Sequence, residues 1–157
     1  MAVLNFASAR NSGSGYACGA KAQEKAPCRA STLYETLLEA PEYDEVHRAG
    51  RSTFYTDRVI HSPGGPFSAM TGANCRRNLP GRMPHLLGPL RGHHPPPGPE
   101  RVAGIPQALA RRAELVFRAA ALHGYPRLVL GARGCGVFQN DPAVVAEAVR
   151  ALTAGPF

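Results

Sequence analysis

The apolar positions divide the chain into two patterned parts. The apolar run AVLNF, residues 2–6, predicts a buried strand. A small, polar, glycine-rich loop follows over residues 7–22. A helix is predicted from residue 23 to about residue 38, with Pro27 in its first turn, where a missing N–H costs little. A second strand is predicted near residues 57–61.

The second patterned part starts at Pro106. Apolar residues there recur at the spacing of one helix face: Leu109, Ala113, Val116 and Ala120. Gly124 is typical of a C-terminal stop for that helix. Residues 127–131, with the sequence RLVLG, predict another buried strand.

A second glycine-rich loop, GARGCGVFQN over residues 131–140, precedes the last predicted helix. Asp141 is expected to cap this helix, with Pro142 in its first position and an end near Thr153. Strands and helices alternate along both patterned parts. This order predicts α/β architecture with a parallel sheet.

Residues 63–99 follow neither pattern. Nine prolines and seven glycines fall in this segment, and no period of 2 or 3.6 is present. Such a composition buries too little apolar surface to offset the entropy lost on ordering. We therefore predict an irregular segment inside a single domain that covers residues 1–157.

The composition fits one domain with reduced thiols, as in a cytoplasm. The hydrophobic content of 44% suffices for one core, and the four cysteines form no CxxC pair. Cys18, Cys28 and Cys135 are expected to be small packing residues. His93 and His94 adjoin one another without further ligands, so no metal site is predicted. We expect neither a signal peptide nor a membrane span, because no long apolar run occurs.

The net charge of +7 is concentrated rather than spread. Four arginines lie within residues 63–99, a stretch without any acid: Arg76, Arg77, Arg82 and Arg91. No basic stripe alternates with aromatic residues, as a nucleic-acid groove requires, so no specific nucleic-acid partner is expected. The arginines of the helix after Pro106 (Arg111, Arg112 and Arg118) are expected to be solvated.

Both glycine-rich loops follow a predicted strand and precede a predicted helix. Ligands of open parallel sheets bind at this end of the strands. Glycine lets the backbone approach a ligand closely, and free N–H groups can cradle phosphate. Gly131, Gly134 and Gly136 would suit a diphosphate, and Phe138 could cover a sugar or a base. The alternative is that both loops are connecting turns with a glycine at each positive φ.

The first loop and its surroundings resemble the bacterial-type poly(ADP-ribose) glycohydrolases, a branch of the macrodomain fold. That family's signature is a glycine triplet, a short spacer and Gln-Glu-Glu. Here Gly13-Ser14-Gly15 stands for the triplet, seven residues follow, and Gln23, Glu24 and Lys25 come next. The stretches VLNFASARN, CRASTLY, YTDRVIHSP and LVLGARGCGVFQNDP also look like the family. The resemblance covers residues 2–63 and 100–157.

The resemblance implies a three-layer α/β/α sandwich, macrodomain-like, with a mixed, mostly parallel sheet truncated at both ends. It implies hydrolysis of ribose–ribose glycosidic bonds in ADP-ribose polymers, without a metal or cofactor. The implied partners are ADP-ribose or poly(ADP-ribose), with ADP-ribosylated proteins as further candidates. The protein is expected to be a cytoplasmic monomer.

The resemblance also implies a role for each matching residue. Asn11 would contact the ribose next to the scissile bond, and Gly13 to Gly15 would wrap that ribose and the diphosphate. Glu24 would orient the substrate through a ribose hydroxyl, and Gln23 belongs to the same ligand-binding set. The second loop would supply a diphosphate contact and a ring against the ribose: Gly134, Cys135, Gly136, Val137 and Phe138.

Two departures from the signature bear on the chemistry. Lys25 occupies the position of the family's catalytic glutamate, and an amine is a poor proton donor near neutral pH. Its positive charge would also repel an oxocarbenium-like transition state. Ser14 adds a Cβ where the backbone should lie against the ligand.

Three hypotheses follow from these departures. The chain is a glycohydrolase of doubtful activity, a non-catalytic ADP-ribose-binding module, or a degenerate product that does not fold stably. In the binding module, Lys25 would add an electrostatic contact to the ligand. Residues 63–99 have the composition that a shifted reading frame gives in GC-rich DNA. The nucleotide sequence tests this: the hypothesis fails if no other frame restores a macrodomain-like strand there.

Overall fold

The computed structural model describes residues 1–20, 22–50, 55–71, 75–87, 103–132, 134–135 and 140–155, with the backbone alone described for 65–71 and 75–87. Its strands and helices, in chain order, are β1 (Ala2–Asn5), α1 (Lys25–Ala30), α2 (Leu33–Leu38), α3 (Pro41–Ala49), β2 (Ile60–Thr71), β3 (Cys75–Leu87), α5 (Ile105–Leu122), β4 (Leu128–Val129) and α6 (Pro142–Thr153).

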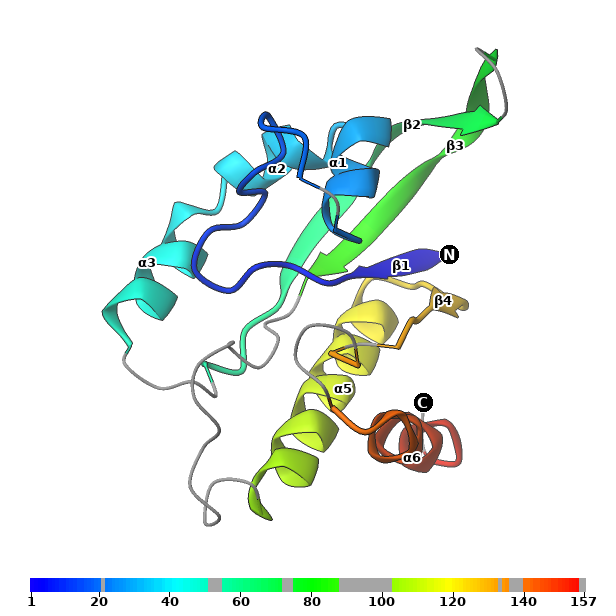
Figure 1. Ribbon diagram of the computed structural model, residues 1–157. Helices are drawn as coiled ribbons and strands as arrows, with labels where there is room; N and C mark the ends of the chain where they lie inside the picture. The colour runs from blue at the N-terminus through cyan, green and yellow to red at the C-terminus, as the bar shows by residue number, and fades with distance from the viewer. Residues whose placement is uncertain are drawn as a thin grey trace.

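The strands form one mixed sheet in the order β2-β3-β1-β4. Strand β1 pairs in parallel with both β3 and β4, whereas β2 and β3 are antiparallel. Helices α1 to α3 lie on one side of the sheet, and α5 and α6 lie on the other (Figure 1). The arrangement is the predicted three-layer α/β/α sandwich, with the first apolar run as its inner strand.

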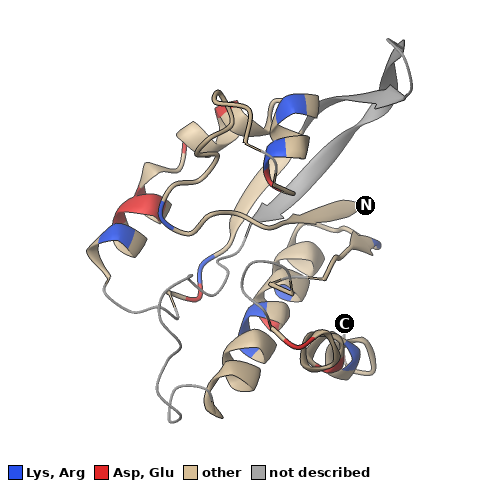
Figure 2. Cartoon of the chain, viewed as in Figure 1, with Lys and Arg blue, Asp and Glu red and all other residues tan. Residues whose placement is uncertain are grey.

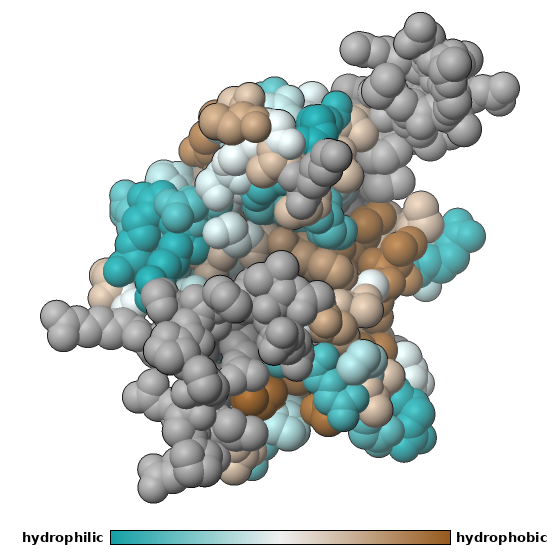
Figure 3. All heavy atoms as spheres, viewed as in Figure 1, coloured by the Kyte–Doolittle hydropathy of each residue, from teal (hydrophilic) through white to brown (hydrophobic). Residues whose placement is uncertain are grey.

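The core consists of two apolar clusters, one on each face of β1. Ala2 and Leu4 pack against α5, where Val116 and Ala120 are buried. Just beyond the strand, Ala7 packs on the opposite side against an apolar cluster from α1 and α2: Cys28, Leu33 and Leu37. Figure 3 shows apolar residues beside β1 and β4, whereas polar residues cover α3.

The helix predicted over residues 23–38 is interrupted. Helix α1 ends at Ala30, and Ser31 has an extended backbone. The Ser31 hydroxyl donates to the carbonyl of Pro27 at 2.8 Å and accepts from the N–H of Leu33 at 3.2 Å. Serine side chains that bond locally in this way compete with helical hydrogen bonds.

Helix α3 was not predicted from the sequence. Pro41 stands in its first turn with Glu42 and Asp44, and His47 and Arg48 lie in its last turn. Proline is favoured at the start of a helix, and this order of charges complements the helix dipole. Those signals could have identified the helix.

The structure differs from the expectation for residues 63–99, because β3 lies wholly inside that segment and most of β2 lies inside it. Strand β2 begins at Ile60 and pairs with β3, with register shifts between Ser62 and Gly65 and between Pro66 and Phe67. Proline lacks the N–H that a ladder needs, so such irregularities are expected beside it. These strands are stabilised by backbone pairing with each other and, for β3, with β1. Composition alone does not predict that pairing. Residues 88–99 lie outside the described residues, and the frameshift hypothesis stays a prediction.

The C-terminal helices agree with the sequence prediction. The Asp141 side chain accepts the N–H of Ala143 at 2.8 Å and so caps α6. Gly124 follows α5 with a φ of +67°. Strand β4 has two residues, fewer than the run over 127–131 predicted. Within the described ranges, no helix combines the length and apolarity that a membrane crossing needs.

Arg112 corrects the prediction that the α5 arginines are solvated. Its side chain is 6% exposed and lies 3.1 Å from Asp57, which also pairs with exposed Arg111 at 3.2 Å. Burial lowers the pKa of the Arg112 guanidinium, and Asp57 opposes that shift. This ion pair joins α5 to the segment before β2.

Candidate functional site

The first glycine-rich loop leaves the carboxyl end of β1 and is held by Glu24. The Glu24 side chain is buried at 2% exposure. One carboxylate oxygen accepts the N–H of Gly13 at 2.8 Å, and the other accepts the N–H of Ser8 at 3.4 Å. Glu24 therefore joins the start of α1 to two points of the loop.

Lys25, the first residue of α1, is buried beside Glu24. It is 5% exposed, and its ammonium group donates to the Glu24 carboxylate oxygen that faces Ser8. Removing one partner of a buried ion pair is costly, because the other charge is left without compensation. Here the two charges cancel, so the pair is locally neutral.

Gln23 fixes this region against β1. Its side-chain oxygen accepts the N–H of Phe6 at 2.7 Å, and its nitrogen donates to the carbonyl of Leu4 at 3.3 Å. Strand β4 pairs with β1 only as far as Val3. The Gln23 amide therefore binds the backbone of β1 and Phe6 beyond the end of that pairing. This contact positions the residues before α1, and a ligand-binding role for Gln23 stays a prediction.

The loop glycines have the backbone conformation that favours glycine. Gly13 and Gly15 have φ values of +71° and +74°. A Cβ on Gly13 would lie 2.7 Å from the Tyr34 ring. Ser14 is exposed and is not among the positive-φ residues, and its N–H donates to the carbonyl of exposed Asn11 at 3.0 Å. The loop therefore accommodates serine at the middle of the triplet.

Several backbone donors of the loop are already used inside the protein. The N–H groups of Ser12 and Gly13 are bound by carboxylates, of Asp44 and Glu24 respectively. Among the described residues, the N–H groups of Gly15, Ala17 and Cys18 have no acceptor. Gly15, Ala17 and Cys18 are exposed residues, so their N–H groups are candidates for contact with an anionic ligand.

The second loop lies next to the first. A Cβ on Gly131 would lie 2.7 Å from the ring of Phe6, which follows β1. Gly134 is buried with a φ of +75°, and the N–H of Cys135 donates to the carbonyl of Ala132 at 3.2 Å. The remaining candidates of this loop lie outside the described residues: Gly136, Val137 and Phe138.

Two buried asparagines near these loops were not identified from the sequence. Asn5 ends β1 with an exposure of 0%, and neither polar atom of its side chain has a partner among the described residues. The side-chain oxygen of Asn140 is also buried without a partner in the described structure. Buried polar groups are normally satisfied. An asparagine inside the apolar run AVLNF was the available signal.

Two of the cysteines that the structure describes differ in burial. Burial, reinforced by nearby Glu24, raises the pKa of the Cys28 thiol to about 11. Cys28 is therefore a packing residue, as predicted, whereas Cys18 is exposed, which corrects the prediction for it. Across the described residues, no cluster of three or more His, Cys, Asp or Glu side chains could hold a metal ion.

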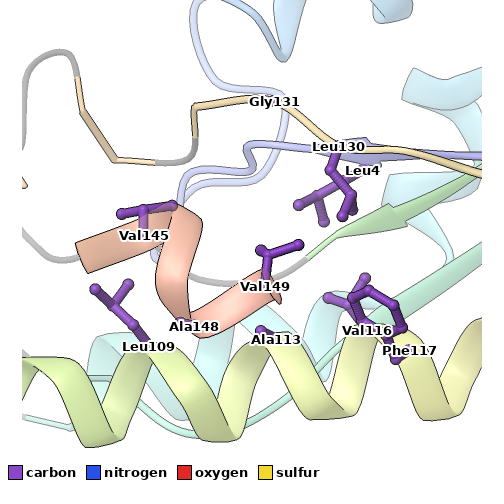
Figure 4. A pocket seen from close by; sticks show the side chains of 10 residues that line it. All are labelled: Leu4, Leu109, Ala113, Val116, Phe117, Leu130, Gly131, Val145, Ala148 and Val149. Atoms are coloured by element: carbon purple, nitrogen blue, oxygen red, sulfur yellow. The ribbon is translucent and has the colours of Figure 1, made fainter. Parts of the chain in front are cut away.

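A small apolar cavity lies between α5, α6 and the ends of β1 and β4, and Gly131, the first residue of the second loop, contributes to its lining (Figure 4). Its volume is about 30 Å³, roughly that of one water molecule. Leu109, Val116 and Val145 contribute to its apolar lining. We interpret it as a packing void rather than a ligand site.

Fold and site together define a macrodomain-like α/β protein with a glycine-rich loop at the end of its inner strand. Residues 1–68 match the family described as microbial-type PARG, catalytic domain. No curated protein matches the chain. Solved structures, in contrast, do match the chain.

Two bacterial poly(ADP-ribose) glycohydrolases are similar over almost the whole chain. The enzyme from Thermomonospora curvata, bound to the inhibitor ADP-HPD, has 42% identity and a TM-score of 0.83, over 94% of this chain and 55% of its own. The enzyme from Deinococcus radiodurans, in complex with ADP-ribose, has 37% identity and a TM-score of 0.84, over 99% of this chain and 62% of its own. The chain thus spans somewhat more than half the length of these relatives.

These findings confirm the resemblance found in the sequence and the macrodomain-like fold. The chain is similar to the microbial-type poly(ADP-ribose) glycohydrolases in the residues that the family model matches, 1–68, and in its fold.

Proposed function

We propose that this chain binds ADP-ribose through the loop of residues 7–20 and does not hydrolyse ADP-ribose polymers. The observation that carries this proposal is the buried ion pair between Lys25 and Glu24, at the position where the family signature has two glutamates. The complexes of the two relatives with ADP-ribose and ADP-HPD support the choice of ligand.

Hydrolysis of a glycosidic bond needs a proton for the leaving oxygen and stabilisation of a developing positive charge. An ammonium group held by Glu24 performs neither task. It is a weak proton donor compared with a carboxyl group tuned by its surroundings. Both Glu24 oxygens also accept hydrogen bonds inside the protein, so this carboxylate is engaged as a loop anchor.

Binding does not depend on the charge of Lys25. The Glu24 carboxylate neutralises the ammonium group, so the pair gives little net attraction for a diphosphate. We infer that the free N–H groups of Gly15, Ala17 and Cys18 supply the main anion contacts. This inference revises the electrostatic role for Lys25 that the sequence hypothesis contained.

The test compares wild type with Lys25→Glu. ADP-ribose binding is measured by calorimetry, and release of ADP-ribose from the polymer by chromatography. We expect wild type to bind without hydrolysis and Lys25→Glu to hydrolyse. Two buried carboxyls side by side would hold one proton between them near neutral pH, which is what a general acid requires.

Two control variants separate the effect of a new carboxyl group at position 25 from the effects of losing the ammonium group and of changing the net charge. Lys25→Gln removes the ammonium group without adding a carboxyl and should stay inactive. Arg118→Glu makes the same change of charge on α5, in the opposite helix layer, and should leave binding and hydrolysis as in wild type. Hydrolysis by wild type would contradict the loss of catalysis. A folded wild type that does not bind ADP-ribose would contradict the proposed ligand. Non-cooperative unfolding would favour the hypothesis of a degenerate product that does not fold stably.

A further inference from the structure

Helix α3 contacts the loop through Asp44. The Asp44 carboxylate accepts the N–H of Ser12, at 3.0 Å to each oxygen, and the Ser12 hydroxyl at 2.7 Å. The same hydroxyl lies 3.3 Å from the carbonyl of Ser8, as a second acceptor. Backbone and side chain of one loop residue are therefore bound by a single carboxylate from α3.

Two arginines also connect α3 with the first loop, one donating from each side. Arg48 of α3 donates to the carbonyl of Arg10 at 2.7 Å, and Arg10 donates to the carbonyl of Gly50 at 3.2 Å. Arg48 also pairs with Asp44 at 3.3 Å. Figure 2 shows acidic and basic residues adjacent on α3. Because Arg48 balances Asp44, the carboxylate can lie near an anion site with little repulsion of the anion.

Asp44 and Glu24 act on consecutive peptide units. The N–H of Ser12 is bound by Asp44, and the N–H of Gly13 is bound by Glu24. These carboxylates come from different helical segments, one in α3 and one just before α1. Hydrogen bonds to a charged acceptor are stronger than neutral ones. Together they determine the path of the loop just before the unpaired donor at Gly15.

We propose that Asp44 is a positioning residue: it holds the loop in its ligand-binding conformation through Ser12 and does not touch the ligand. This rests on the proposed function. Ordering a loop residue costs roughly 1–2 kcal/mol of conformational entropy. A loop ordered before the ligand arrives avoids that cost on binding, which is how pre-organisation raises affinity.

The test measures ADP-ribose affinity by calorimetry for the full chain and three variants. Asp44→Ala removes every contact between residue 44 and Ser12. We expect ADP-ribose to bind about tenfold more weakly, a loss of about 1.4 kcal/mol. Asp44→Asn keeps one acceptor oxygen and should lie between Asp44→Ala and wild type, which is partial rescue. Glu42→Gln removes a charge from the same first turn of α3, at an exposed side chain, and should bind like wild type.

Amide hydrogen exchange measured by NMR provides a readout that does not require the ligand. The Ser12 N–H should exchange faster in Asp44→Ala than in Glu42→Gln at equal global stability. Equal affinity of Asp44→Ala and wild type would overturn the proposal, and so would equal weakening by Glu42→Gln. If Asp44→Ala does not fold, Asp44→Asn decides by the same comparison. If wild type does not bind ADP-ribose, the proposed function is wrong, and unchanged Ser12 exchange would separately show that Asp44 does not hold the loop.

Discussion

Replacing Gly13 by alanine tests the packing of the loop against α2. Gly13 has a φ of +71°, and an added Cβ would lie 2.7 and 2.8 Å from two carbons of the Tyr34 ring. A left-handed backbone costs a non-glycine residue about 1–2 kcal/mol, partly offset by the lower entropy of the unfolded chain. Overpacking adds about 1–3 kcal/mol. We expect Gly13→Ala to lose about 2–4 kcal/mol of unfolding free energy.

The matched control is Gly19→Ala. Gly19 has a φ of +73°, yet nothing lies within 4 Å of a Cβ built on it. This variant therefore carries the left-handed backbone cost alone, about 1 kcal/mol after the offset from the unfolded chain. Urea unfolding followed by circular dichroism measures both variants. For a chain of this size, the loss expected for Gly13→Ala corresponds to a fall in Tm of roughly 5–15 °C.

A double mutant identifies the cause of the difference. In a Tyr34→Ala background the ring is absent, so the extra cost of Gly13→Ala should shrink to that of Gly19→Ala. The interaction energy from the double-mutant cycle should then be about 1–3 kcal/mol. The reasoning is refuted if Gly13→Ala and Gly19→Ala cost the same in the wild-type background, or if removing Tyr34 changes nothing.

Three further predictions concern other parts of the molecule. Burial lowers the pKa of His61 below 6.5, and so does the charge of His123, whose ring stacks on that of His61, so the unfolded state binds more protons. Stability should therefore fall as the pH drops below about 6.5, and the pH dependence of Tm should weaken in His61→Gln. Iodoacetamide at pH 7.5 should label exposed Cys18 and spare Cys28, with peptide masses as the readout; early labelling of Cys28 would contradict its burial. Asp141→Ala should cost about 1 kcal/mol through loss of the α6 cap, measured by urea unfolding; an unchanged midpoint would argue against the cap.

The amino-acid sequence determined the features that depend on neighbouring residues. The cap at Asp141, the apolar face through Val116 and Ala120, and β1 as an inner strand all follow from short patterns, and the structure has them. The α/β class and the two glycine-rich loops are also readable in this way. Family resemblance added the proposed ligand and the proposed significance of Lys25, which no periodicity contains.

Only the tertiary structure decided which polar groups meet. Asp44 binds Ser12 from 32 positions away, and Arg112 reaches Asp57 across 55 positions. Lys25 and Glu24 are adjacent in sequence, but their burial as a pair depends on the packing of α1 against the loop. Local sequence patterns indicate whether a segment is a helix or a strand and which of its faces is buried. Contacts between distant side chains arise only when the layers of the fold pack together.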